Sequence, residues 1–563
     1  MGISKRGEKN WKSREQVKGG LEDQLFFALG IEKSEEKEAF LNPDYDKHLR
    51  DPFGMLGMDK AVERILLAIK NNEKIVLFGD YDADGIGGAV VFYDFFKKIG
   101  FENFEVYIPD RNKEGYGLTL GAIDKFAEKK VDLIITIDCG ITDCDEVERA
   151  NGKGIDTVIL DHHLEQDCLP KAVAVVDVKQ KNDKYPFDSF CGAGVAFKTV
   201  EALLQKGDFN VVDGWNKWFL DVVCISTVAD MVPLVDENRV LVHYGLKVLK
   251  QTQRPGLLAL FKKLKMKKEN ITEDDLAFFV GPRINVASRM DTATTSFNLL
   301  VTENSNEADW IAERLDKKNT ERKDIAGKVI EEVESKMKDG ASDDLLFFGS
   351  QDWEPGVLGV VANRLLERYN KPVVLWGKGD SEKIKGSSRC DGSVNLVDLM
   401  NKVDDSFFVE KGGHAVAAGF TAVEEKIEGL GEALKNAYKK IEKIEVDNEL
   451  WVDKEIALDE LTWSFLETIE KFSPFGVGNP RPNFLLKDLE VSGVKMFGNG
   501  GIHLQLDFEG NGKKISAVGF FMSNEKSFDI KKGTIVDLVA NVERNTFMNR
   551  NELRLKIVDY KIK

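Results

Sequence analysis

Residues 75–85 read IVLFGDYDADG, a short apolar run that leads into aspartates at positions 80, 82 and 84. An apolar run of this length is typical of a buried strand. Carboxylates two residues apart project to one side of extended backbone, so we expect Asp80, Asp82 and Asp84 to converge where the strand ends. Crowded negative charges are costly unless cations neutralise them, so this stretch predicts a metal site.

Two further apolar runs end in the same way. Each leads into acidic or imidazole side chains: Asp138 after residues 133–137, and Asp161, His162 and His163 after residues 157–160. Segments with a helical pattern lie between the runs, at residues 89–98, 118–129 and 143–150. This alternation of β and α elements predicts a doubly wound parallel sheet. Because ligands bind beyond the carboxyl ends of such strands, we expect the three groups to form one site.

Two simpler interpretations of the aspartates compete with a metal site. An EF-hand loop needs a bidentate Glu at its twelfth position, which is Val91 when Asp80 is the first, so an EF-hand is excluded. Asp84 could instead cap the following helix, and Asp84 taken alone does not decide between a cap and a metal ligand. The groups at the other two strand ends favour the metal site.

The residue types indicate which ions would bind. Several carboxylates with one or two imidazoles and no thiolate favour Mn²⁺ or Mg²⁺, and Mn²⁺ suits imidazole better; zinc is a weaker alternative. Two such ions can share a hydroxide and stabilise both the attacking and the leaving oxygen of a phosphoryl displacement. No Walker loop, Ser-His-Asp spacing or reactive-cysteine motif competes. The predicted chemistry is therefore phosphoester hydrolysis.

Several motifs carry a family resemblance. Those of the first half resemble the DHH phosphoesterase superfamily: GDYDADG from Gly79, IDCGI from Ile137, LDHH from Leu160 and STVADMVPL from Ser226. Others resemble its RecJ branch, single-strand-specific 5′ to 3′ DNA exonucleases: IPDRNKEGYGL from Ile108, GPRINVASRMD from Gly281, GSSR from Gly386, GGHAVAAGF from Gly412 and SPFGVGNPRP from Ser473. The resemblance spans nearly the whole chain from about residue 40.

The resemblance implies a catalytic role for each matching position. The implied metal ligands are Asp82, Asp84, Asp138, His162 and Asp230, with Asp138 as the bridge between two ions. Asp80 is expected to support the ligands directly or through water, and His163 to contact the scissile phosphate. From the residues alone, Asp161 could orient the histidines or cap the next segment, and Asp230 could be a turn residue before Pro233.

A second set of positions is expected to bind substrate. Its members are Arg111, Ser387 and Arg389 at a 5′-terminal phosphate, Arg283 and Arg289 at further phosphates, and His414 in a glycine-rich stretch. A guanidinium forks onto phosphate oxygens, although a lone Arg is more often a surface residue or an ion pair and a lone His is more often structural. The chain departs from the family at Ser288, where Gly is usual, and at Glu354, where His is common. Ser288 can be accommodated unless its φ is positive.

Breaks in pattern divide the chain into six predicted segments. They are an N-terminal extension (1–45) that packs on the first domain or frays, an α/β core (46–200), a helical part of that lobe (201–302), a long connecting helix (303–340), a second α/β domain (341–445) and an OB-type β-barrel (446–563). The fold class is therefore multidomain α/β, and the second α/β unit resembles the DHH-associated domain. Barrels of this type bind single strands through aromatics and a basic groove, for which Phe497, His503, Phe547 and Arg550 are candidates, although each could equally be an ordinary core or rim residue. Residues 473–482 are expected to form a rigid turn that closes the barrel onto the cleft between the two α/β domains.

Composition limits the setting in which the chain works. A net charge of −17 is unusual for an enzyme of nucleic acids. Some of the acid belongs to the metal site, and an acidic enzyme suits delivery by basic or DNA-bound partners, of which the family suggests a single-strand-binding protein and a helicase. No apolar run is long enough to span a membrane and no signal peptide is evident, so we expect no membrane association. Six cysteines without a CxxC pair favour a reducing cytoplasm.

These features predict a metal-dependent, single-stranded-DNA-specific 5′ to 3′ exodeoxyribonuclease that releases 5′ mononucleotides, with a place in DNA repair and recombination. The alternatives are a DHH-family phosphodiesterase of oligonucleotides or cyclic dinucleotides, a non-catalytic RecJ-like replication scaffold, and a pyrophosphatase. The long helix and the terminal barrel disfavour the enzymes of small substrates. The intact carboxylates disfavour the scaffold.

Overall fold

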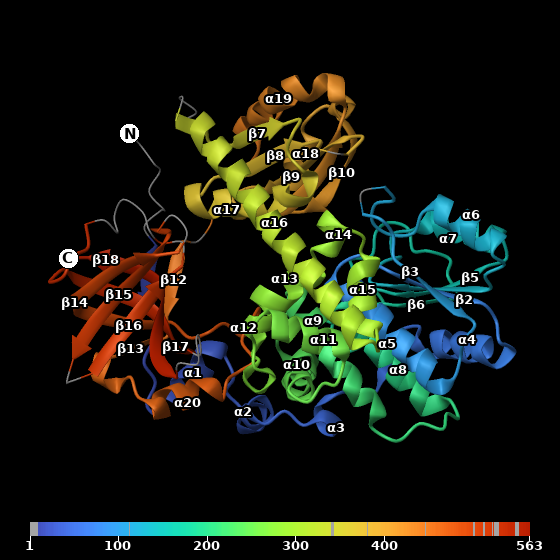
Figure 1. Ribbon diagram of the computed structural model, residues 1–563, viewed down its shortest axis with the longest axis horizontal. Coiled ribbons are helices and arrows are strands. Elements are labelled where there is room, and N and C mark those ends of the chain that lie inside the picture. The colour runs from blue at the N-terminus through green and yellow to red at the C-terminus, as the bar shows by residue number, and fades with distance from the viewer. Residues whose placement is uncertain are drawn as a thin grey trace.

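The computed structural model describes residues 9–111, 113–338, 343–379, 381–444, 446, 448–498, 501–510, 513–520, 522, 529–545 and 551–563. In these ranges two α/β domains and a β-barrel surround the long helix α16 (Ser305–Lys338). Figure 1 shows the barrel on the left, the first α/β domain on the right and the second at the top, with α16 running between the lobes. Among the described residues, no helix is long and apolar enough to cross a membrane.

The first domain is built on a parallel sheet. Its strands, in spatial order, are β3 (Phe104–Tyr107), β2 (Ile75–Gly79), β4 (Leu133–Ile137), β5 (Asp156–Leu160) and β6 (Ala174–Val176). The three predicted strands and the doubly wound order are confirmed. Strands β3 and β6 were not predicted, because β3 is interrupted by Glu105 and is not a continuous apolar run, and β6 has only three residues. The chain reverses its winding direction between β2 and β4, which is where such sheets bind ligands.

Helices cover both faces of this sheet. One face packs on α4 (Met58–Asn71), α5 (Ala83–Ile99) and α8 (Gly192–Lys206), and the other on α6 (Leu120–Glu128) and α7 (Cys144–Gly152). Both faces are apolar, so β2 and β4 are fully buried along their length. A disulfide joins Cys144, at the start of α7, to Cys168 in the loop after His163. The cysteine spacing did not predict this pairing.

The rest of the first lobe is helical, as predicted. Its elements are α9 (Leu220–Ala229), α10 (Asp236–Leu249), α11 (Pro255–Lys263), α12 (Glu273–Asp275), the π-helical turn η4 (Leu276–Val280), α13 (Gly281–Ile284), α14 (Ala287–Met290) and α15 (Thr294–Val301). Helix α16 follows with 34 residues, so the predicted long helix is confirmed. The helix continues through its single glycine, Gly327, and a Cβ there would meet no atom within 4 Å, so the glycine marks neither a break nor a close contact.

The second domain is a mixed sheet. Its spatial order is β10 (Phe408–His414), β11 (Ala417–Ala422), β9 (Ile384–Arg389), β8 (Val373–Gly377) and β7 (Leu346–Ser350). Helix α17 (Pro355–Tyr369) covers one face together with α16, while α18 (Leu396–Asn401) and α19 (Ile427–Lys440) cover the other. The predicted strands β7, β8 and β9 and the helix α17 are confirmed.

The C-terminal domain is a closed barrel. Its strands are β14 (Phe484–Phe497), β15 (His503–Gly510), β16 (Lys513–Gly519), β18 (Glu552–Ile562) and β17 (Ile535–Asn545), and β17 closes onto β14. Four of these strands were predicted. Strand β14 was not, because irregular register on both of its neighbours interrupts the alternation of apolar and polar residues.

The N-terminal extension packs differently from the prediction. Strand β1 (Asn10–Ser13) pairs with β12 (Glu449–Val452) at the barrel, and α1 (Leu21–Leu29) buries Phe26 in the barrel core, with its ring 4.8 Å from that of Phe472. The first lobe is contacted by α2 (Ser34–Leu41), where the carbonyl of Phe40 accepts from Nε of Arg239 at 2.9 Å, and by α3 (Tyr45–His48), which packs on α10. The expectation that residues 1–45 pack on the first domain is therefore wrong for β1 and α1. The apolar face of α1 is complementary to the open end of the barrel core, a long-range match that no local pattern reveals.

The segment 473–482 fixes the barrel to the first lobe. The Arg239 guanidinium donates to the carbonyls of Phe472, Ser473 and Pro474 at 2.9 to 3.3 Å. The buried Glu273 carboxylate accepts from the backbone N–H of Phe475 and from Arg481, both at 3.1 Å. The predicted rigid turn thus acts as the joint between two domains.

We expect Glu273→Gln to loosen this joint. The substitution removes a buried charge that accepts hydrogen bonds from Ser473, Phe475 and Arg481, a loss of about 2 kcal/mol. Limited proteolysis between the first lobe and the barrel should become roughly 30-fold faster, because cleavage follows the population of the open form. Glu269→Gln, at an exposed position four residues before Glu273, should leave the proteolysis rate unchanged. Equal rates for both variants would contradict this role of Glu273.

Candidate metal centre and phosphate site

Three aspartates follow strand β2 in one tight turn. Asp80 comes directly after the strand, and Asp82 caps helix α5 by accepting from the backbone N–H of Asp84 at 2.8 Å. Asp84 lies in the first turn of that helix. The three carboxylates therefore converge through a strand-to-helix turn and not on extended backbone as predicted. The helix-cap alternative applies to Asp82, while Asp84 has other partners.

Asp84 is held by the start of helix α8. Its carboxylate accepts from the backbone N–H groups of Gly192 at 2.5 Å and of Ala193 at 2.8 Å. The positive end of a helix stabilises a carboxylate in this position. Glycine is required at 192, because a Cβ there would lie 2.5 Å from the Cβ of Asp138.

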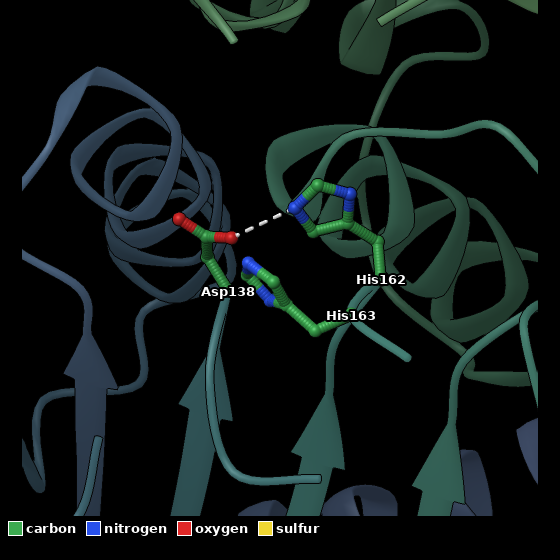
Figure 2. A group of neighbouring side chains, drawn as sticks. All are labelled: Asp138, His162 and His163. Atoms are coloured by element: carbon green, nitrogen blue, oxygen red, sulfur yellow. Dashed lines mark ion pairs between the residues drawn. The ribbon is translucent and has the colours of Figure 1, made fainter. Parts of the chain in front are cut away.

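Asp138 and His162 approach from the next two strands, β4 and β5 (Figure 2). Asp138 has φ 65°, a left-handed conformation that is strained for a residue with a side chain. Nε2 of His162 lies 3.1 Å from Oδ1 of Asp138, 3.7 Å from Asp84 and 3.8 Å from Asp230. Asp230, which follows α9, thus reaches the same site as the strand-end residues.

The ligand atoms form overlapping groups in which all atoms lie within 4.8 Å of one another. The groups are Asp80, Asp82 and Asp138; Asp84, His162 and Asp230; and Asp138, His162 and His163. Asp138 and His162 each belong to two of them, and of these two residues only Asp138 has a pair of oxygens, as a bridging ligand needs. The buried Oδ1 of Asp80 and Nδ1 of His162 have no hydrogen-bond partner in the described structure. Oxygen donors with one imidazole fit a pair of Mn²⁺ or Mg²⁺ ions.

The protonation of these groups follows from their surroundings. Burial, and after it the neighbouring carboxylates, raise the pKa of Asp138 well above its usual range and that of Asp230 to about 8. The same causes raise the pKa of Asp84 to about 6. Burial lowers the pKa of His162 to about 3, so its imidazole is neutral and able to act as a ligand. Without cations the site carries a large cost of repulsion.

His163 is placed differently from His162. Its Nδ1 lies 2.8 Å from Oδ1 of Asp161 and 3.0 Å from the hydroxyl of Tyr116. Burial opposes its protonation, but the hydrogen bond and charge of Asp161 outweigh burial and raise the pKa of His163 to about 9. Asp161 also accepts from the backbone N–H of His162 at 2.8 Å. Asp161 therefore both orients His163 and caps the turn, so the two alternatives left by the sequence hold together.

Tyr116 was not singled out from the sequence, although it lies within the motif that contains Arg111. Its hydroxyl is 3.0 Å from the carbonyl oxygen of Asp138 and contacts the ring of His163, so it ties one strand end to the next. The signal for it was an aromatic residue between two glycines, both of which have positive φ.

We expect Tyr116→Phe to lower kcat about 10-fold with little change in KM. The substitution keeps the ring but removes the hydroxyl that fixes His163 and the Asp138 backbone, and outer partners of this kind are worth 10- to 100-fold. The check is steady-state hydrolysis of single-stranded DNA with the pH profile of kcat, in which the limb assigned to His163 should move. Tyr93→Phe, remote from the site, serves as the control. An unchanged pH profile would contradict the positioning role.

A group of cations lies beside the metal centre. The guanidinium carbon of Arg111 is 5.0 Å from the ring centroid of Tyr81, which stands between Asp80 and Asp82. Burial and the charge of Arg111 lower the pKa of Arg389, so these two guanidinium groups are close. Burial, followed by Arg111 and Arg322, lowers the pKa of Arg289 to about 9. The structure thus brings three of the predicted substrate residues together.

Strand β9 supplies one side of this group. Lys385, Ser387 and Arg389 alternate along it and therefore share a face. Nη1 of Arg389 donates to Oγ of Ser387 at 3.2 Å. Lys385 was not predicted; the period-2 spacing to Ser387 and Arg389 was the available signal. Its pKa is lowered by burial and by Arg111, so it belongs to the same group.

Two predicted substrate residues are placed elsewhere. Arg283 is buried and bound to Asp316 of α16, with Nε 3.0 Å from Oδ1. His414 is exposed at the end of β10, where it pairs in register with Ala417, which pairs in turn with Arg389. It is therefore not the buried structural histidine of the alternative interpretation. Substrate contact by Arg283 and His414 stays a prediction.

The departures from the family pattern have structural outcomes. Ser288 lies within helix α14 with negative φ, so its side chain is accommodated and donates to the carbonyl of Asn285 at 3.2 Å. Glu354 is the residue before α17, and its carboxylate lies against Gly379. A Cβ added to Gly379 would be only 2.6 Å from that carboxylate. In the barrel, Phe497 lines a groove of about 850 Å³ and lies 5.1 Å from the ring of His503. Phe547 and Arg550 lie outside the described residues.

Comparison with known proteins agrees with this architecture. The N-terminal domain of the DHH family matches residues 74–227, the DHHA1 domain matches 342–440, and the RecJ OB domain matches 452–559. The predicted segment boundaries stay predictions.

Curated relatives and solved structures extend the match. The chain is 33% identical over 541 residues to the single-stranded-DNA-specific exonuclease RecJ of Bacillus subtilis, covering 95% of this chain and 67% of that protein. It is 30% identical to the protein of the same name from Escherichia coli, with 82% of each chain covered. The crystal structure of Thermus thermophilus RecJ in complex with Mn²⁺ has the same fold, with a TM-score of 0.78 and 23% identity over 96% of this chain and 75% of that one. The chain belongs to the RecJ family of single-stranded-DNA-specific exonucleases.

Proposed function

We propose that this chain hydrolyses single-stranded DNA from its 5′ end and releases 5′ mononucleotides. The observation that carries the proposal is the adjacency of two sites. One is a carboxylate–imidazole centre suited to two divalent cations, and the other is a cationic group whose Arg111 packs on the ring of Tyr81, between Asp80 and Asp82 in the sequence. A phosphodiester at the first and a terminal phosphate at the second would be neighbours along one strand. This arrangement favours an exonuclease over an enzyme that cuts within a strand.

The metal ligands in this proposal are Asp82, Asp84, Asp138, His162 and Asp230, with Asp80 beside Asp82. Two bound cations would activate a water molecule and stabilise the charge on the leaving 3′-oxygen. The protein's own part is to hold its carboxylates close together, although burial and their mutual repulsion raise the pKa of Asp138 and favour its neutral form until cations bind. Asp138 and His162 each fall in two of the three groups, and Asp138 is the proposed bridge because only its carboxylate has two oxygens that could each bind a cation.

His163 is proposed to contact the scissile phosphate. Asp161 keeps its ring protonated and fixed through Nδ1, which leaves Nε2 to donate to a phosphate oxygen. Arg111, Ser387 and Arg389 are proposed to hold the 5′-terminal phosphate, with Arg289 at the next one. When the scissile phosphate and the 5′-terminal phosphate are both held, the bond to be cut is oriented and the product length is set at one nucleotide.

The wider setting is also a proposal. RecJ relatives are named for single-stranded DNA, and a chain of net charge −17 would gain from partners that bring it to DNA, such as a single-strand-binding protein and a helicase. A role in repair and recombination, in the cytoplasm, is consistent with such partners.

The test is digestion of a long single-stranded DNA labelled at one end. With Mn²⁺ or Mg²⁺ present, 5′-phosphorylated DNA should release mononucleotides from the 5′ end, duplex DNA should resist, and EDTA should stop the reaction. Release from the 3′ end, or products that begin as long fragments, would overturn the proposal. Hydrolysis of dinucleotides alone would favour the small-substrate alternative.

A further inference from the structure

The disulfide between Cys144 and Cys168 joins two segments that leave the carboxyl edge of the first sheet. Cys144 is the first residue of α7, which follows β4 and Asp138. Cys168 lies between β5 and β6, in residues 161–173, which we call the β5 loop and which also contain His163. The bond therefore connects two of the segments that supply the metal centre, although no proposed catalytic step uses it.

The β5 loop has few other attachments. Across residues 164–172, no backbone–backbone hydrogen bond forms within the described part of the chain. The side chains of Leu164 and Leu169 are 67% and 44% exposed, so they do not anchor the loop in the core. Its other described polar contacts lie at the surface: Glu165 with Lys181, Lys171 with Glu148, and the carbonyl of Lys171 with Asn151. The disulfide is therefore the strongest tie between this loop and the rest of the domain.

The other end of the bond stands on a fixed support. Asp143, directly before Cys144, is buried, and its carboxylate accepts from the backbone N–H of Leu118 at 2.7 Å. Leu118 follows closely on Tyr116, whose hydroxyl lies 3.0 Å from Nδ1 of His163. The bond thus ties the loosely held β5 loop to a part of the domain that already contacts His163.

This pair contains the only cysteines of the chain that solvent reaches, and all six lie in the described ranges. Cys168 is exposed and Cys144 is half-buried. The four free cysteines are all buried: Cys139, Cys191, Cys224 and Cys390. A reducing compartment keeps accessible thiols reduced, and a shift toward oxidised low-molecular-weight disulfides bridges them. An oxidant should therefore act on Cys144 and Cys168 and spare the rest.

We propose that Cys144 and Cys168 form a redox modification site that fixes the β5 loop and raises the turnover of the metal centre. In the reduced protein, the loop moves from His163 onward. In the bridged protein, Asp161 fixes one end of this stretch and Cys144 fixes the other, so His163 stays longer in the geometry that the reaction needs. The effect on turnover rests on the proposed function, whereas the bridge and its effect on the loop do not.

The oxidant is a low-molecular-weight disulfide such as oxidised glutathione. The exposed Cys168 thiolate attacks one sulfur of this disulfide, forms a mixed disulfide and releases one glutathione thiolate. The Cys144 thiolate then attacks the Cys168 sulfur, forms the protein disulfide and releases the second glutathione thiolate. The two cysteines lose two electrons and two protons, and the two glutathione thiolates take up the protons.

The first measurement is the formation of the bridge in the full-length chain. The protein is reduced, freed of the reductant and incubated with oxidised glutathione. Unfolded samples should contain six thiols per chain before oxidation and four after it. Peptide mapping should find residues 144 and 168 in one linked peptide, and Cys168→Ser should give no such peptide. The matched control is Cys224→Ala, which removes a buried thiol of α9 and keeps the pair.

Limited digestion with trypsin measures the mobility of the loop. Lys171 is exposed within the β5 loop. Cleavage after it should be about 10-fold faster in the reduced protein than in the bridged one, because cleavage follows the population of the open loop. Cleavage after Lys267, an exposed site elsewhere in the first lobe, should have the same rate in both states and in Cys168→Ser, which also shows that this variant is folded.

Turnover is measured on a long 5′-phosphorylated single strand, with Mn²⁺ added after the redox reagents are removed. We expect kcat of the bridged protein to exceed that of the reduced protein about 3- to 10-fold, less than the 10- to 100-fold that a directly bonded outer partner is worth. KM should change little, because the bond holds no predicted substrate contact. Cys168→Ser should keep the kcat of the reduced parent with or without oxidant, while Cys224→Ala should respond as the parent does.

The outcomes separate this proposal from the proposed function. If oxidised glutathione leaves six thiols or links a different pair, the modification site is wrong and the exonuclease proposal stands. If the bridge forms but kcat is equal in the two states, the effect on turnover is wrong, and an equal rate of cleavage after Lys171 would also overturn the effect on the loop. If the wild-type chain cleaves DNA in neither state, the proposed function fails. The thiol counts and trypsin rates then decide the bridge and the loop by themselves.

Discussion

Replacing Asp138 by Asn is expected to lower the hydrolysis of single-stranded DNA by about 10³-fold or more. Asp138 is shared by two of the ligand groups, so its loss disturbs both metal positions. Even partners behind a metal ligand are worth 10- to 100-fold, and a shared ligand should exceed that. The measurement is kcat/KM at saturating Mn²⁺, with metal content determined for the same sample.

The same substitution should stabilise the metal-free protein. Burial and neighbouring carboxylates raise the pKa of Asp138, so its ionised form opposes folding at neutral pH. This penalty is absent below the ordinary Asp pKa of about 3.9 and complete above the raised pKa of the fold. In EDTA, Asp138→Asn should therefore raise Tm at pH 8, by about 2 to 4 °C for each kcal/mol relieved, and the gain should disappear near pH 4.

Glu128→Gln, exposed at the end of α6, is the control for both measurements and should change neither. A loss of activity accompanied by a lower Tm in EDTA would instead indicate a folding defect. Activity within a few-fold of wild type would remove Asp138 from the metal centre.

Arg389→Gln is expected to abolish most of the preference for a 5′ phosphate. Its guanidinium lies beside Arg111 and next to Ser387 on β9, and a charged hydrogen bond to phosphate is worth about 1.5 to 3 kcal/mol. We therefore expect kcat/KM for 5′-phosphorylated DNA to fall about 10- to 150-fold, while kcat/KM for DNA with a 5′ hydroxyl changes little. The measurement is competition between the two substrates in one reaction.

Lys439→Gln, an exposed cation on α19 of the same domain, is the control. An equal fall on both substrates would show that Arg389 supports the fold of β9 and does not read the 5′ end. In that case Lys385, on the same face of the strand, would be the next residue to test.

The sequence made strong predictions where a local pattern carries the structure. The apolar runs before Asp80, Asp138 and Asp161 are buried strands of one parallel sheet, and their acidic ends meet because parallel strands share a carboxyl edge. The metal centre was predictable for the same reason. The uninterrupted helical residues around α16 and the short strands of the barrel also had local signals.

Other features depend on contacts between distant residues. Asp84 is held by the start of α8, more than a hundred residues later, and Tyr116 reaches His163 and Asp138 across strand ends. The position of α1 in the barrel core and the binding of Arg283 to Asp316 likewise have no local pattern.

The sequence by itself therefore determined the class of each domain, the residue types of the metal centre and the chemistry they support. Only the tertiary structure decided which donors each side chain uses, which arginines gather near the metal centre, and that Lys556 of the barrel lies against the ring of Phe278. The physical reason is that periodicity is written in neighbouring residues, whereas the satisfaction of buried charges and donors depends on whatever the fold brings within about 3 Å of them.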